Sequence, residues 1–172
     1  TAGALKNSIQ TLMRVGSDEN RLRELVELRE LLEPGVAELA ARRAEREEIE
    51  RMQAMIDEMS SHMDDETSYI RADNRFHQLI ALASRNRLIP RILDSIVDLL
   101  NELRGEIFQV EGGPERGQAH HRTILAAIRD RDAPAARMAM EDHLAQVKRD
   151  SEFAARKRAR LLGEEAHRKD EP

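Results

Sequence analysis

Apolar side chains recur every three or four residues along nearly the whole chain, and few residues interrupt the pattern. Residues at this spacing lie on one side of an α-helix, so each uninterrupted stretch predicts an amphipathic helix. Glycine and proline stand at the places where such helices would end. The stretches run over about 22–41 with a kink or break at Pro34, 45–63, 69–84, 87–109, 114–130 and from 134 onward. The sequence therefore predicts an all-α fold, an antiparallel bundle of about six to seven helices.

Composition narrows the classes of protein that this bundle can be. The 172 residues suit a single domain, and with 2% aromatic residues its core must be aliphatic. The chain has no cysteine, which excludes disulfides and thiolate metal sites. A formal net charge of −5 makes this chain by itself a poor partner for nucleic acid. No apolar run approaches the roughly 18–20 residues of a membrane span, so we expect a soluble, cytoplasmic domain without a membrane partner.

Three predicted helices carry polar residues on their apolar faces. In the stretch 69–84, Asp73 and His77 are one helical turn apart on the buried side. His121 shares a face with Ile124 and other apolar residues of the next-but-one stretch, and His143 does so in the last stretch. All four side chains are therefore expected to point inward.

Helical rise places these residues at one depth in the bundle. If the last two stretches form a hairpin that turns near Asp132, His121 lies eleven residues before the turn and His143 eleven after it. At 1.5 Å per residue, both stand about 16 Å from the turn. The same estimate brings His77 within a turn or two of that level. One aspartate and three histidines can thus converge.

A buried histidine taken alone is more often a hydrogen-bonded core residue than a metal ligand. Four such groups together need many partners, and one divalent ion satisfies all of them. Three imidazoles and a carboxylate suit a divalent transition metal, and they argue against Ca²⁺, which prefers oxygen ligands. We expect Zn²⁺ first, although Ni²⁺, Co²⁺, Fe²⁺ and Mn²⁺ also fit these donors.

Arg29 is a further polar residue on an apolar face, between Leu25 and Leu32 in the first predicted helix. One interpretation makes it an edge residue that reaches solvent or pairs with a glutamate. The other directs its guanidinium into the interior, where it could bind a carboxylate with two hydrogen bonds. A metal ion together with an arginine is a suitable receptor for a small organic acid.

Four segments of the chain resemble a known family. They read ELRELLEPGVAELAA at 27–41, DNRFHQLIALASRN at 73–86, HHRTILAAIRDRD at 120–132 and AARMAMEDHL at 135–144. In this order and spacing they resemble FCD, the ligand-binding C-terminal domain of GntR-type bacterial transcription regulators of the FadR subfamily, and more closely its metal-binding branch. The resemblance covers about residues 22–147.

The resemblance implies an all-helical effector domain that binds a divalent metal and a small carboxylate metabolite, commonly as a homodimer. Its metal ligands fall on Asp73, His77, His121 and His143, and its effector-binding residues on Arg29 and Asn86; Asn86 could equally be a helix cap. It further implies a winged helix-turn-helix before Thr1 that binds operator DNA. We therefore expect a linker or leading helix over 1–18, the effector domain over 19–150 and a charged helix end or tail over 151–172.

Two other functions are compatible with these residues. An Asp/His₃ metal site with an open position could activate water in a metal-dependent hydrolase, although no glutamate stands in an HExxH-like relation to the ligands. The bundle could also be purely structural, with the histidines as core residues and no metal. Turnover of a bound acid would indicate the enzyme, and absence of stoichiometric metal would indicate the structural bundle.

Overall fold

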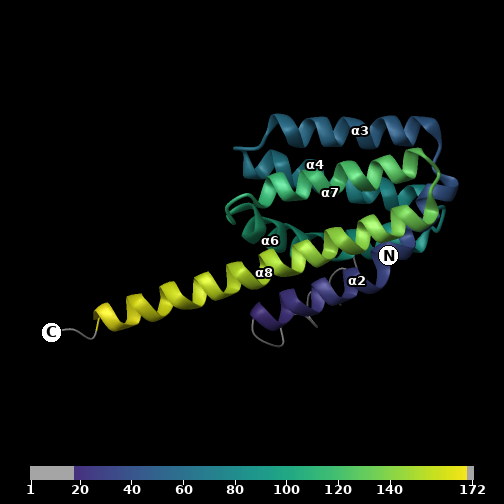
Figure 1. The fold of residues 1–172 in the computed structure, drawn as a ribbon. Coiled ribbons are helices and arrows are strands. Elements are labelled where there is room, and N and C mark those ends of the chain that lie inside the picture. The colour runs from purple at the N-terminus through teal and green to yellow at the C-terminus, as the bar shows by residue number, and fades with distance from the viewer. Residues whose placement is uncertain (1–17, 170–172) are drawn as a thin grey trace.

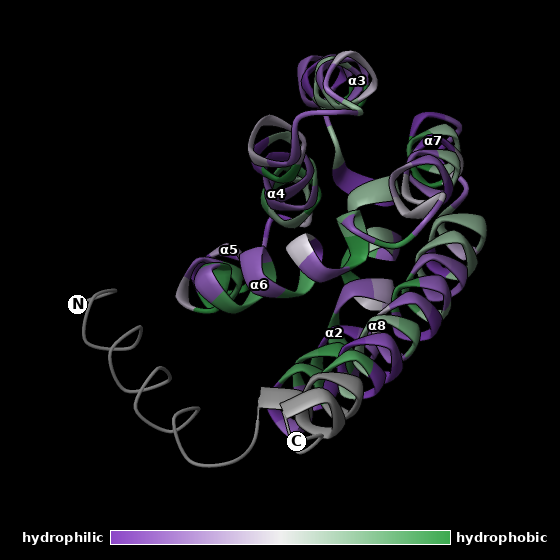
Figure 2. Ribbon diagram, turned by 90° about the vertical axis from the view of Figure 1, so that its left-hand side faces the viewer, coloured by the Kyte–Doolittle hydropathy of each residue, from purple (hydrophilic) through white to green (hydrophobic). Residues whose placement is uncertain are grey.

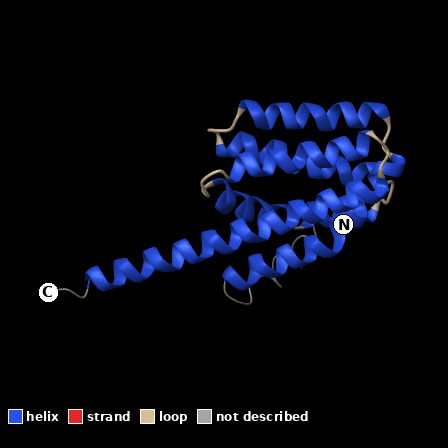
Figure 3. Ribbon diagram, viewed as in Figure 1, coloured by secondary structure: helices blue, strands red, loops and turns tan. Residues whose placement is uncertain are grey.

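The computed structural model describes the backbone of residues 18–169, with side chains described for 20–162, and this part of the chain is helical with no strand (Figure 3). The all-α prediction is confirmed. The linker or leading helix predicted over 1–18 lies outside the described residues, apart from Asp18. Over the described range there are seven helices, namely α2 Asp18–Arg43, α3 Arg46–Ser61, α4 Glu66–Ala83, α5 Leu88–Ser95, α6 Val97–Phe108, α7 Gly113–Arg129 and α8 Ala133–Lys169.

Three of these helices start with residues that are typical of helix N-termini. The side chain of Asp65 caps α4 by accepting a backbone N–H of its first turn, and the side chain of Asp132 accepts the backbone N–H of Ala135 at the start of α8, at 3.0 Å. Gly112 precedes α7 with a φ of 69°, a left-handed conformation that glycine adopts without strain. Pro114 follows in the first turn of α7, where its missing N–H is not needed.

The prediction of a single helix over 87–109 is wrong, because the structure divides this stretch at Ile96 into α5 and α6. The hydroxyl of Ser95 donates to the carbonyl of Ile92 at 2.6 Å. In an unbroken α-helix that carbonyl would accept the N–H of Ile96. The N–H of Ile96 instead donates to the carbonyl of Leu93, and Ile96 leaves the helical region with φ −110° and ψ 9°.

Two helices are long. The predicted break at Pro34 does not occur, since α2 continues through this residue. An internal proline costs a helix roughly 3 kcal/mol, and Val36 and Ala37, two and three residues after it, are buried in the core, which favours the continued helix. The last helix, α8, runs on to Lys169 and extends beyond the rest of the bundle (Figure 1).

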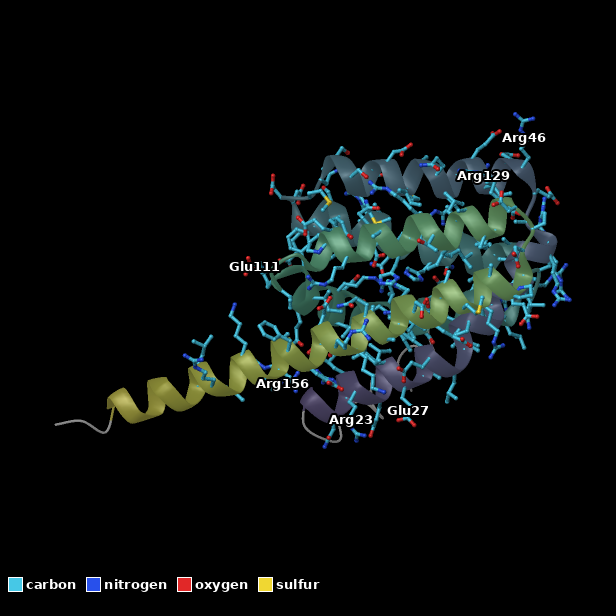
Figure 4. The ribbon with its side chains drawn as sticks, in the orientation of Figure 1. Arg23, Glu27, Arg46, Glu111, Arg129 and Arg156 are labelled. Carbon is cyan, nitrogen blue, oxygen red and sulfur yellow. The ribbon has the colours of Figure 1, made fainter. Side chains whose placement is uncertain are left out.

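The helices pack around one aliphatic core. The most extensive helix contact is between α2 and α8, followed by the α7–α8 and α3–α4 hairpins. Viewed after a quarter turn, hydrophobic positions gather on the inner sides of α2, α4 and α6 (Figure 2). Charged residues such as Arg46, Glu111 and Arg129 lie at the periphery and are exposed (Figure 4). Buried charges are the exception in this molecule, and they are concentrated in one region.

Candidate metal centre

The four residues predicted to converge do come together. Asp73 and His77 are on α4, His121 on α7 and His143 on α8, and none is more than 5% exposed. One ring nitrogen from each histidine can be chosen so that all three lie within 4.8 Å of one another. Asp73 Oδ1 lies 3.1 Å from Nε2 of His121 and 3.6 Å from Nε2 of His77. The three histidines thus form a group whose nitrogens could hold one ion, and the carboxylate of Asp73 lies beside two of them.

The imidazole rings pack against one another and against one aromatic side chain. The ring of His143 stacks on that of His77 with centroids 5.3 Å apart and lies 4.8 Å from that of His121. Phe76, which is fully buried, lies 4.9 Å from the His121 ring. This packing limits rotation of the imidazole rings.

Several polar atoms of this cluster are buried and have no hydrogen-bond partner among the described residues. They are Oδ1 of Asp73, both ring nitrogens of His77, both ring nitrogens of His121 and Nδ1 of His143. Nδ1 of His77 lies 2.9 Å from a carboxylate oxygen of Glu33, but without the alignment of a hydrogen bond. A buried polar atom without a partner is costly, and native proteins have few of them. Burial also lowers the pKa of both His121 and His143 well below the ordinary value, so these rings are neutral at neutral pH. Neutral imidazole is the form that binds a metal.

Arg29 is 2% exposed and does not reach solvent. Its Nε donates to Oε1 of Glu33 at 2.6 Å, and its Nη2 donates to Oε2 at 3.3 Å. Oε2 of Glu33 also lies 2.9 Å from Nδ1 of His77. Burial alone would raise the pKa of Glu33, but Arg29 and His77 outweigh it and hold this pKa well below its usual range. Glu33 is therefore a buried anion between an arginine and a histidine of the cluster.

A second buried guanidinium, that of Arg104 on α6, also lies beside the cluster. Its Nε donates to Oδ2 of Asp73, while Nη1 and Nη2 are buried without a partner. Burial and the nearby Arg29 lower the pKa of Arg104 to about 9, so it remains a cation at neutral pH. Arg104 thus has free hydrogen-bond donors beside the candidate metal ligands.

Two cavities meet at these charges. The larger has a volume of about 470 Å³, lies between α3, α4, α5 and α6, and has Glu33, His77 and Arg104 among its lining residues. The smaller, of about 40 Å³, is bounded by Arg29, Asp73, His121 and His143 and also by Arg104. A water molecule needs roughly 10–15 Å³ of such space, so the smaller cavity is large enough for an ion and a water molecule. Arg104 lines both cavities.

The sequence profile of the FCD domain matches residues 24–146. This chain belongs to the FCD domain family. The FCD domain is the effector domain of GntR-family transcription regulators, and it is a regulatory domain rather than an enzyme. The metal-dependent hydrolase considered from the sequence therefore has no support in the family.

Relatives of this FCD domain are bacterial regulators. It is 33% identical over 131 residues to the HTH-type transcriptional regulator LutR of Bacillus subtilis, covering 73% of this chain and 60% of LutR. It is 32% identical over 137 residues to the Uxu operon transcriptional regulator of Escherichia coli, covering 73% and 51%. A solved structure of Streptococcus agalactiae GntR superposes with a TM-score of 0.67 at 28% identity, covering 79% of this chain and 62% of the other. The chain thus spans about half to three fifths of the length of these relatives.

The described helices were also compared with the length and hydropathy that a membrane span requires, and none of them meets both requirements.

Not every residue at the centre of this FCD domain was predicted from its sequence. Glu33 and Arg104 were missed, although both follow the rule that identified Arg29. Glu33 is one turn after Arg29 on the same face, and Arg104 is one turn after Leu100 on the apolar face of its helix. Asn86, by contrast, is exposed in the α4–α5 turn, where its side chain accepts the backbone N–H of Leu88 at 3.0 Å. This bond stabilises the turn that leads into α5, whose N-cap is Arg87, and contact of Asn86 with an effector stays a prediction.

Proposed function

We propose that this FCD domain binds one divalent transition metal through Asp73, His77, His121 and His143 and a small organic acid beside it. Acid binding would control operator DNA binding by a winged helix-turn-helix in the same polypeptide. The observation that carries this proposal is the cluster of buried donor atoms without partners. A divalent ion would satisfy them together.

The donor set favours Zn²⁺, with Ni²⁺, Co²⁺, Fe²⁺ and Mn²⁺ as the other candidates. When bound, the ion supplies a positive charge and Lewis acidity that attract a carboxylate oxygen. The protein's own residues would hold the four donors and keep bulk water away, since none of the four is more than 5% exposed and Phe76 lies against one imidazole. This environment strengthens the attraction between opposite charges.

For the acid, we favour Arg104 over Arg29. The guanidinium of Arg29 is already occupied by Glu33, whereas Nη1 and Nη2 of Arg104 are unpaired and border both cavities. A guanidinium with two free donors is suited to a carboxylate. A further relative, at 24% identity, is named the galactonate operon transcriptional repressor of Escherichia coli, and galactonate is itself a carboxylate. Arg29 would then contribute positive charge beside the bound acid.

Control of DNA binding follows from where these residues lie. Arg29 and Glu33 are on α2, the first described helix, so the preceding part of the protein is attached directly to an element of the centre. In a cytoplasmic homodimer, a shift of α2 would change the spacing of two DNA-binding domains. An acid can shift that equilibrium only through different affinities for the two arrangements.

The first test is elemental analysis by plasma mass spectrometry on protein purified without a nickel column or chelator. We expect about one divalent ion per chain, with clear loss in Asp73→Asn but not in the exposed control Asp57→Asn. Metal-loaded protein is then screened by thermal shift against lactate, citrate and sugar acids, with the corresponding neutral alcohols as controls. Absence of metal after incubation with zinc and nickel would refute the metal centre and favour a structural bundle. Equal shifts with acids and alcohols would refute the acid.

A further inference from the structure

Glu33 is a buried carboxylate at the centre that neither metal ligation nor acid binding uses. It lies in α2 directly before Pro34 and is 3% exposed. A buried carboxylate is tolerated only when it is paired, and Glu33 has two partners, Arg29 and His77. Its contact with His77 joins α2 to α4 through a candidate metal ligand.

The two nitrogens of His77 face different groups. Nδ1 lies 2.9 Å from Oε2 of Glu33, and Nε2 lies 3.6 Å from Oδ1 of Asp73. A neutral imidazole has one N–H and one lone pair, and only the nitrogen with the lone pair can bind a metal. A carboxylate beside Nδ1 favours the proton there, which leaves the lone pair on Nε2.

We propose that Glu33 is a positioning residue of the metal centre, holding His77 with its proton on Nδ1 and its Nε2 lone pair toward Asp73 and the other two histidines. This inference rests on the proposed metal site. Carboxylates that hold ligand histidines in this way commonly change metal affinity by about 10–100-fold. Arg29 holds the carboxylate in turn with two hydrogen bonds, so the chain of contacts runs from Arg29 through Glu33 to His77.

The main variant for the test is Arg29→Met/Glu33→Met. Removing only one member of a buried ion pair leaves an unpaired charge, whereas replacing both with apolar residues is often tolerated. The matched control is Arg46→Met/Glu50→Met, because these residues form the same i,i+4 pair on α3 with side chains 93% and 62% exposed. Glu33→Gln is a second variant that keeps the volume and a weaker, uncharged acceptor.

Two measurements are made on each variant. Long-range proton–nitrogen NMR of the metal-free protein reports which nitrogen of His77 carries the proton, and competition titration with Co²⁺ and Zn²⁺ reports affinity. We expect the proton on Nδ1 in the wild type and the control. In the double variant we expect loss of this preference with affinity 10–100-fold lower, and in Glu33→Gln a smaller loss in the same direction.

Unchanged affinity in a folded double variant would overturn the inference. An unchanged His77 proton position would also overturn it, even with lower affinity, because Glu33 would then act only on the fold. If the double variant does not fold, Glu33→Gln with wild-type affinity and proton position has the same meaning. Failure of the wild type to bind any metal would instead refute the metal centre itself, and the two failures are therefore distinguishable.

Discussion

Replacing Arg104 with methionine tests the charge balance of the centre most directly. Arg104 is the cation that faces Asp73, and the two residues are 7% and 5% exposed. Arg104→Met leaves a buried carboxylate without its cation, which typically costs about 3–5 kcal/mol. For a chain of this length each kcal/mol lowers Tm by roughly 2–4 °C, so the metal-free variant should melt about 6–20 °C below the wild type.

Bound metal should reduce this loss, because the ion takes over as the positive partner of Asp73. If about 1 kcal/mol of lost packing remains in the metal-loaded variant, the two states differ by about 2–4 kcal/mol. Thermodynamic linkage converts that difference into affinity, at roughly 1.4 kcal/mol for each factor of ten. Arg104→Met should therefore bind the metal about 30- to 700-fold more tightly than the wild type.

The assay is urea unfolding with chelator and with saturating Co²⁺, combined with a separate Co²⁺ titration. The control is Arg137→Met, whose arginine is 50% exposed in surface ion pairs and should change stability by less than about 1 kcal/mol in either state. Equal destabilisation of Arg104→Met with and without metal, or an unchanged Co²⁺ affinity, would refute the reasoning. Either result would show that the ion and the guanidinium do not share Asp73.

Three further predictions concern the pH dependence of stability and the substitution of two glycines by alanine. Because burial lowers the pKa of His121 and His143 in the folded state, the unfolded chain binds more protons as pH falls below about 6.5. Stability of the metal-free protein should then fall between pH 7 and 5 by up to about 1.4 kcal/mol per pH unit for each histidine; a flat profile of urea midpoints would contradict this. Gly113→Ala should destabilise by about 1–3 kcal/mol, since its Cβ would lie 2.3 Å from the carbonyl oxygen of Ile107; an unchanged Tm would contradict this. Gly35→Ala, with nothing within 4 Å of the new Cβ, should stabilise α2 by about 0.5–1 kcal/mol in urea unfolding, and any destabilisation would argue against it.

The sequence predicted best those features that depend only on residues close together in the chain, such as the side of a helix on which a residue lies. Helical period depends only on neighbouring residues, so it showed that Asp73, His77, His121 and His143 point inward before any helix was packed against another. Equal distances from the turn near Asp132 then placed two of them at one height. The same local rule failed at Ile96, where the backbone N–H donates to the carbonyl of Leu93 and the residue leaves the helical region, and the periodic pattern contains no sign of that break.

Pairing between helices was decided by the tertiary structure. Arg29 and Glu33 are one turn apart on α2, so their pairing is local, but only the folded chain shows that Glu33 also reaches His77 on α4. Likewise, the side chain of Arg104 could not be paired with Asp73 from spacing, since they are 31 residues apart on separate helices. A sequence period gives the direction of a side chain about its own helix. The partner that it meets depends on how helices cross and rotate against one another, which packing of the whole core determines.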